Sequence, residues 1–214
     1  MPRETSDASI VAKTRAALWA IPLAAAVWIV IFAWQPANFW ILMTAGVGGL
    51  GCLALAVRGP FPLREGMRAP DLALGLAASA VLYAVFAAGR ILAGYVLPFA
   101  GAEIGAVYVI RAQAPVWVIT LALVLVIGPG EELFWRGLIQ WGLVRRLGPL
   151  RGWAAATLLY GLVHAAAGNF MLVVAALAAG ACWGWMYLRM GRIAPVVASH
   201  ILWDVTVFLL LPLR

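Results

Sequence analysis

The chain has 214 residues, enough for one domain, but 65% of them are hydrophobic and only 11% are charged. Soluble domains are about half apolar and about a quarter charged, so this chain has too few charges to cover a surface in water. The composition therefore excludes disordered, collagen-like, disulfide-stabilised and ordinary soluble proteins, and it indicates an integral membrane protein. The net charge of +7 requires no nucleic acid partner, because basic residues are typical of the cytoplasmic loops of membrane proteins.

Apolar runs, taken in chain order, predict an all-α, polytopic membrane bundle of about seven transmembrane helices. Each run is close to the ~20 residues that cross a hydrocarbon core of about 30 Å, and none alternates as a strand would. Six to eight spans fit, because the run over 72–97 is long and residues 98–114 could lie along the membrane surface. Residues 1–16 are expected to form a cytoplasmic tail. The predicted spans are 17–34, 39–57, 72–97, 115–142, 152–168, 170–188 and 194–212.

The basic residues support this path through the membrane. Eleven of them fall in one set of tails and loops, and only Arg111 and Arg214 fall in the other set. Because Lys and Arg accumulate in cytoplasmic loops, we expect the amino terminus in the cytoplasm and the carboxyl terminus outside. The richness in Ala and Arg indicates a bacterial gene, and hence the bacterial cell membrane. The eleven residues are Arg3, Lys13, Arg15, Arg58, Arg64, Arg68, Arg145, Arg146, Arg151, Arg189 and Arg192.

A group of acids, histidines and one arginine falls inside apolar runs rather than in loops. An acid or Arg at a helix centre costs about 2.5–3.5 kcal/mol on insertion scales, so four together cost on the order of 10 kcal/mol if unpaired. They are therefore expected to face one another or a water-filled cavity. The group consists of Glu131, Glu132, Arg136 and Asp204, together with both histidines of the chain, His164 and His200.

Helical spacing sorts this group into pairs. Glu132 and Arg136 stand at i and i+4, about 6 Å apart on one face, and are expected to pair; His200 and Asp204 have the same spacing. Glu131 is rotated by about 100° from Glu132 and is left for another task. At about 1.5 Å per residue, the groups on three helices reach similar depths, in the cytoplasmic half of the membrane or near its midplane.

Imidazoles and carboxylates in one shielded site suit hydrolysis. Glu131 in a low-dielectric site can act as a general base near neutral pH and take a proton from a water that attacks a carbonyl. One His could share that proton, and a second His, anchored by Asp204, could donate to the oxyanion. The alternative is a zinc site with Glu131, His164 and His200 as ligands and one position open for water. Spacing alone leaves both chemistries open.

Three short motifs resemble those of the CPBP intramembrane proteases, the family of the type II CAAX prenyl endopeptidases and of bacterial Abi-type proteins. They occur in the family's order on successive helices and use both histidines. The resemblance covers residues 115–214, the expected catalytic core, whereas the spans in 17–114 carry no recognised motif. The motifs are EExxxR at Glu131 to Arg136, FxxxH at Tyr160 to His164 with Tyr for Phe, and HxxxN at His200 to Asp204 with Asp for Asn.

The resemblance implies a role for each residue of the first two motifs. Glu131 would activate the attacking water with the help of His164. Glu132 and Arg136 would support the site through their ion pair. Tyr160 would replace the family's Phe as a packing residue, and the alternative is that its hydroxyl donates a hydrogen bond into the site. The family has been described both with and without a catalytic metal, and the metal-free interpretation is preferred here, so no cofactor is required and Zn is the alternative.

The third motif departs more from the family pattern. His200 and Asp204 would stabilise the oxyanion, but an ionised Asp only accepts hydrogen bonds, whereas Asn also donates. Asp204 is therefore either protonated, or it orients His200, or it ligates a metal.

Together these features predict an intramembrane endopeptidase that cleaves near the carboxyl end of a membrane-anchored or lipidated protein. In a bacterium a sorting tail or a peptide is the preferred substrate. A proton-coupled transporter is one alternative, because transporters also place acids and histidines at mid-membrane. A non-catalytic Abi-type immunity or scaffold protein is the other.

Overall fold

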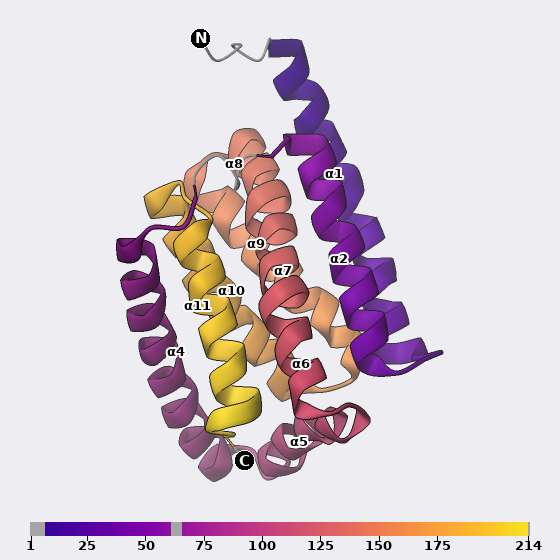
Figure 1. The fold of residues 1–214 in the computed structure, drawn as a ribbon, viewed down its shortest axis with the longest axis vertical. Helices are drawn as coiled ribbons and strands as arrows, with labels where there is room; N and C mark the ends of the chain where they lie inside the picture. The colour runs from indigo at the N-terminus through magenta and orange to yellow at the C-terminus, as the bar shows by residue number, and fades with distance from the viewer. Residues whose placement is uncertain (1–6, 61–65, 214) are drawn as a thin grey trace.

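The computed structural model describes residues 7–60 and 66–213, which form a bundle of helices with no strand among them (Figure 1). In the first half of the chain, α1 continues as a π-helix, and α5 is followed by a 3-10 helix. These elements are α1 (Asp7–Ile29) with its π-helix (Val30–Trp34), α2 (Phe39–Arg58), α4 (Ala69–Val96), α5 (Ala100–Val107) and the 3-10 helix (Tyr108–Gln113).

In the second half, α6, α7 and α8 form one rod, because π-helical segments join them. The elements are α6 (Val116–Ala122), α7 (Gly128–Phe134) and α8 (Trp141–Leu147), with π-helices at Leu123–Ile127 and Trp135–Gln140. They are followed by α9 (Pro149–His164), a 3-10 turn (Ala165–Ala167), α10 (Phe170–Met190), α11 (Ala194–Val205) and a last π-helix (Thr206–Leu210).

Five rods are long and apolar enough to cross a membrane: Asp7–Trp34, Phe39–Arg58, Ala69–Val96, Val116–Leu147 and Phe170–Met190. The prediction of an all-α polytopic bundle is confirmed, although the described chain supplies five such helices and the prediction was about seven. The other two predicted spans are shorter helices. One is α9, which gives way to a 3-10 turn after His164 and then to Gly168 in a left-handed conformation; the other covers Ala194–Leu210.

Helix α1 begins at Asp7, so it includes ten of the residues 1–16 that were expected to form a cytoplasmic tail. Asp7 lies in the first turn, where a carboxylate is favourable beside the helix amino terminus. Ala, Lys13 and Arg15 favour helix as strongly as apolar residues do, so the rod starts before the apolar run begins. Residues 1–6 lie outside the described residues.

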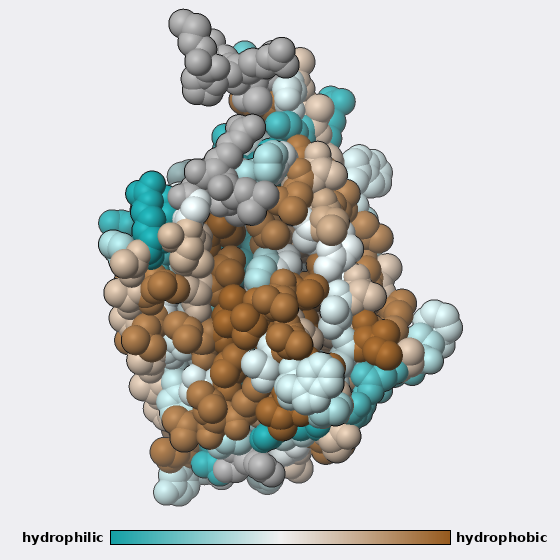
Figure 2. Space-filling model, in the orientation of Figure 1, coloured by the Kyte–Doolittle hydropathy of each residue, from teal (hydrophilic) through white to brown (hydrophobic). Residues whose placement is uncertain are grey.

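Charge separates the two ends of the bundle. The described basic residues that were predicted to share one side lie at the end where α2, α8 and α10 finish, called here the basic end (Figure 1). Figure 2 shows hydrophobic residues over the middle of the molecule, with polar residues toward its ends. The described members of the set are Lys13, Arg15, Arg58, Arg68, Arg145, Arg146, Arg151, Arg189 and Arg192; Arg3 and Arg64 lie outside the described residues.

Residues 100–113 cross the opposite end of the bundle as α5 and its 3-10 helix, and we call them the strap (Figure 1). The strap is tied to α2, because Gln113 Oε1 accepts a hydrogen bond from Phe39 N at 2.8 Å. It is also tied to α10, because Glu103 Oε2 accepts one from Met171 N at 2.9 Å. This segment, ambiguous in sequence, therefore covers the end of the bundle opposite the basic end.

The Gly128-Pro129-Gly130 run sets the course of the helix that carries Glu131. Pro129 lacks the N–H that a regular helix needs, and a π-helical turn precedes it. Both glycines permit close contacts, because an added Cβ would lie 2.8 Å from Val47 of α2 at Gly130 and 2.8 Å from Ile201 of α11 at Gly128. Helix α7 is thus held tightly between α2 and α11.

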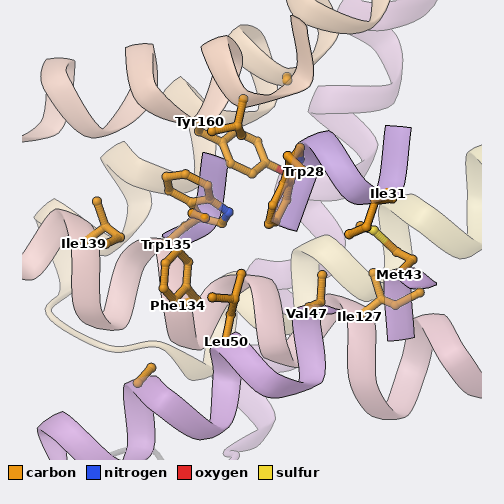
Figure 3. Close-up of a cluster of buried hydrophobic side chains, with 14 of the residues drawn as sticks. Trp28, Ile31, Met43, Val47, Leu50, Ile127, Phe134, Trp135, Ile139 and Tyr160 are labelled. Carbon is orange, nitrogen blue, oxygen red and sulfur yellow. The ribbon is translucent and has the colours of Figure 1, made fainter. Parts of the chain in front are cut away.

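The largest apolar cluster joins α1 and α2 to the motif-bearing helices (Figure 3). At its edge the rings of Trp28 and Trp135 meet with centroids 5.7 Å apart, and Trp135 meets Tyr160 at 5.3 Å. The first two helices, which carry no motif, therefore form a wall behind the second half of the chain.

Candidate active site

Three helices bring the predicted catalytic residues to one cavity of about 600 Å³. Glu131 comes from α7, His164 from α9, and His200 and Asp204 from α11, with Tyr160 beside them. All five side chains are buried. The expectation that the intramembrane acids and histidines face one another or a cavity agrees with this arrangement.

Glu132 forms the hub of an ion-pair network next to the cavity. Its Oε1 lies 2.8 Å from Arg136 Nη1, which confirms the pair predicted from the i,i+4 spacing. The same oxygen lies 2.7 Å from His200 Nδ1, a contact that links α7 to α11. Arg136 also places its guanidinium over the Tyr160 ring, 4.7 Å from the centroid. Glu132 is fully buried, so its charge is stabilised in the bundle by the two cations that contact it, Arg136 and His200.

His200 is held on three sides. Its Nδ1 faces Glu132, and its Nε2 lies 3.4 Å from Asp204 Oδ2, so the pair expected from spacing is present. Carboxylates only accept, so Nδ1 donates to Glu132, and an imidazolium suits a ring that has a carboxylate on each side. Trp183 stacks on the ring with centroids 3.9 Å apart and planes 18° apart, and its own N–H donates to Ser199. The looser Nε2 contact is the one that a reacting group can replace.

Glu131 differs from the other two site carboxylates, because it accepts from a neutral group. Its Oε2 accepts a 2.8 Å hydrogen bond from the Tyr160 hydroxyl. Of the two roles expected for Tyr160, the hydrogen bond into the site is therefore the one that is present. Tyr160 and Glu131 lie on different helices, so the spacing within each motif does not reveal that the hydroxyl reaches the carboxylate.

His164 has partners at both ring nitrogens. Its Nδ1 lies 2.7 Å from the backbone carbonyl of Tyr160, which can only accept, so Nδ1 carries the proton. Nε2 then accepts from the indole N–H of Trp28 at 3.3 Å. Trp28 belongs to α1 and is 1% exposed. A residue of the first helix thus orients an imidazole that lies 136 positions further along the chain.

Trp28 and Trp135 offer a matched pair of substitutions. Both are 1% exposed, but among the described residues the Trp135 N–H has no hydrogen-bond partner. Trp28→Phe should therefore lower the free energy of unfolding by about 1–3 kcal/mol more than Trp135→Phe, because only it leaves a buried acceptor, His164 Nε2, unpaired. Equilibrium unfolding in mixed micelles measures both. Equal losses would show that the indole N–H does not hold His164.

The residues named for the zinc alternative do not form a metal site. The ring nitrogens of His164 and His200 already contact Tyr160, Trp28, Glu132 and Asp204. Within residues 7–60 and 66–213, no three His, Cys, Asp or Glu side chains are grouped so that they could hold a metal ion. With these contacts in place, the three side chains are not arranged as zinc ligands.

Sequence reasoning missed Trp28 and Trp183, which orient the two imidazoles. The structure buries Trp183 against His200. No signal in the sequence connects Trp28 with His164, because the contact joins two helices far apart in the chain. For Trp183 the nearby glycines of α10 were the available hint, since they indicate a face that packs closely.

Residues 112–206 match the family described as type II CAAX prenyl endopeptidase Rce1-like. This segment contains all the predicted site residues and excludes Trp28. No curated protein and no solved structure matches the chain. The resemblance inferred from the three motifs is therefore confirmed by the family match.

Proposed function

The chain carries an Rce1-like type II CAAX prenyl endopeptidase domain over residues 112–206, and from this premise we propose that it is an intramembrane endopeptidase with a glutamate-activated water. Its substrate is a membrane-anchored or lipidated protein, cleaved near the carboxyl end; in a bacterial cell membrane a sorting tail fits best. The chain is an integral membrane protein by its apolar helices and its family. We place the basic end in the cytoplasm.

The position of Glu131 is the observation that carries this proposal. It is the site carboxylate that faces the cavity without a cation in direct hydrogen-bond contact, since it accepts from Tyr160 whereas Glu132 and Asp204 contact His200. A carboxylate held this way accepts a proton from water more readily than one bound in an ion pair.

The proposed reaction needs one water and one peptide bond. Glu131 takes a proton from the water as its oxygen bonds to the carbonyl carbon. His164 Nε2 gives up its 3.3 Å hydrogen bond from the Trp28 N–H and accepts one from that water instead, which positions the water. The oxyanion receives the N–H of His200 that otherwise faces Asp204. The carbon–nitrogen bond then breaks, and the proton held by Glu131 goes to the leaving amine, so a carboxylic acid and an amine result.

Reconstitution with candidate membrane-anchored peptides tests the proposal. The parent chain should release a carboxyl-terminal fragment, detected by mass spectrometry, and His164→Ala should lose this activity. Retained cleavage by that variant would count against the assignment. Solute uptake into the liposomes without cleavage would favour a transporter, and specific capture of a membrane protein without either activity would favour a scaffold.

Removal of metal ions should leave cleavage unchanged. The proposed reaction uses no metal, and within residues 7–60 and 66–213 no three His, Cys, Asp or Glu side chains are grouped so that they could hold one. The measurement is the cleavage rate before and after dialysis against a chelator, with metal content followed by mass spectrometry. Loss of activity with the metal, restored by added Zn²⁺, would contradict the proposed mechanism.

A further inference from the structure

The cavity extends from the catalytic residues toward only one end of the bundle. On α7 and α9 its lining stops at Glu131 and Tyr160, and on α10 and α11 it stops at Trp183 and His200. The described residues between these limits and the basic end do not line it, nor do those of α4 before Val85. The cavity is therefore closed toward the basic end and extends toward the strap.

A buried polar layer closes the cavity on the side of the basic end. Glu132 and Arg136 are 0% and 2% exposed, and Gln140, one turn further, is 1% exposed. Gln140 donates to the Gly184 carbonyl at 2.8 Å, which ties the rod to α10. A peptide approaching from the basic end would have to break this network.

The strap closes the cavity at the end opposite the basic end. Ile104, Val107 and Tyr108 of the strap line the cavity, so they form its floor. Trp40 of α2 donates to the strap carbonyl of Ile110 at 2.9 Å, and Tyr108 accepts from Leu213 N at 2.9 Å. With both ends covered, a side opening is left.

That opening lies between α4 and α10. The exposed residues of the cavity lining all belong to these two helices, among them Leu92 at 64% and Val96 at 65% on α4. On α10, Phe170 is 53% exposed and Val174 is 41% exposed. The two helices pack in one cluster nearer the basic end, through Leu82. We call the gap between α4 and α10 on the strap side of this cluster the window.

We infer that the substrate enters laterally through the window, from the half of the bilayer opposite the basic end, which is the non-cytoplasmic half. The inference rests on the proposed function for the identity of the occupant. The rim is mostly aliphatic and aromatic, so it suits an apolar chain already in hydrocarbon. The basic end, which holds the described Lys and Arg residues other than Arg90, Arg111 and Arg136, faces the cytoplasm. The preferred substrate is thus anchored in or exposed to the outer leaflet.

Photolabelling tests the window without any need for cleavage. A phospholipid with a diazirine in the middle of one acyl chain is added to spheroplasts, which loads the outer leaflet, or to inside-out vesicles, which loads the cytoplasmic leaflet. Labelled residues are identified by mass spectrometry. Ala176 and Ala156 are 6% and 5% exposed, but only Ala176 lines the cavity. We expect label at Ala176 from the outer leaflet and several-fold less at Ala156.

An Ala112→Cys variant in a background without Cys52 and Cys182 reports the side independently. Its strap thiol should react with a membrane-impermeant reagent in spheroplasts. Equal labelling of Ala176 and Ala156 would overturn the window, and labelling of Ala176 only from the cytoplasmic leaflet would overturn the sidedness. Either failure is distinct from that of the proposed function, because the readout requires no proteolysis.

Leu92 and Ile91 connect the window to turnover. Both are exposed, at 64% and 58%, but only Leu92 lines the cavity. Leu92→Trp should raise KM for a membrane-anchored substrate at least fivefold, and Ile91→Trp should leave it unchanged. An equal effect of both substitutions would contradict access through the window.

Discussion

Glu131→Gln should lower the rate of peptide cleavage about 10²–10⁴-fold, the usual contribution of a general base. The substitution keeps an oxygen that can accept from Tyr160, so the local geometry is preserved while the proton acceptor is lost. The measurement is kcat on a reconstituted substrate, with KM determined in parallel. Because the substitution removes the proton acceptor and not a contact that binds the substrate, KM should change little.

Glu103→Gln is the matched control for this result. It makes the same chemical change on a carboxylate that does not line the cavity; its oxygen accepts from Met171 N, and an amide oxygen can replace it there. Cleavage by Glu103→Gln should stay close to that of the parent chain. Cleavage by Glu131→Gln at more than a tenth of the parent rate would remove Glu131 from the role of base.

Arg136→Met should lower the free energy of unfolding by about 3–5 kcal/mol, because breaking a buried ion pair leaves an uncompensated charge. Glu132 would then rely on His200 alone, and its second oxygen already lacks a partner among the described residues. Equilibrium unfolding in mixed micelles gives the value. Arg146→Met, on the exposed surface of the same rod, should change stability by less than about 0.5 kcal/mol.

The double variant Glu132→Gln, Arg136→Met separates charge from packing. Without the acid at position 132, the missing cation no longer leaves that position with an unpaired buried charge, so the double variant should be more stable than Arg136→Met alone. It should still be slow in cleavage, because His200 loses its closest carboxylate. Equal destabilisation of the single and double variants would show that Arg136 stabilises the fold by packing alone.

Contacts within one helix were predictable from the sequence, because helical geometry is local. The Glu132–Arg136 and His200–Asp204 pairs follow from i,i+4 spacing, and both are present. The meeting of the helices that carry them was also predictable, since unpaired ionisable groups in hydrocarbon are costly.

Contacts between distant helices could not be predicted in the same way. Nothing local relates Trp28 to His164, or Glu132 to His200, because helix rotation and tilt decide which side chains meet. The hydroxyl of Tyr160 was underestimated for this reason: a Tyr and a Phe have the same pattern in an apolar helix, and only the facing carboxylate distinguishes them. The direction in which the cavity opens depends on the same tertiary arrangement.

The spacing of polar residues also says little about helix ends. α1 starts ten residues before the predicted span 17–34, at Asp7, because a helix can continue into water beyond the hydrocarbon. The structure likewise forms the helical strap over residues 100–113, within the segment 98–114 that the sequence left ambiguous and that could lie along the membrane surface. Both differences concern segments whose conformation depends on packing more than on hydropathy.

The orientation of His200 bears on the unusual Asp204. Of the roles left open for this residue, the contact at 3.4 Å between Asp204 and His200 supports an orienting one. An Asp in this position favours an imidazolium, which donates to an oxyanion more strongly than a neutral ring does. The family's Asn would instead donate a hydrogen bond of its own.

The most direct test of one shared site is a cycle of cleavage rates for Glu131→Gln, His200→Ala and the double variant. Groups that act in one transition state lose their effects together, so the double variant should be no more than a few-fold slower than Glu131→Gln alone. A rate equal to the product of the two separate losses would mean that the carboxylate on α7 and the imidazole on α11 act independently, and the single catalytic cavity would be contradicted.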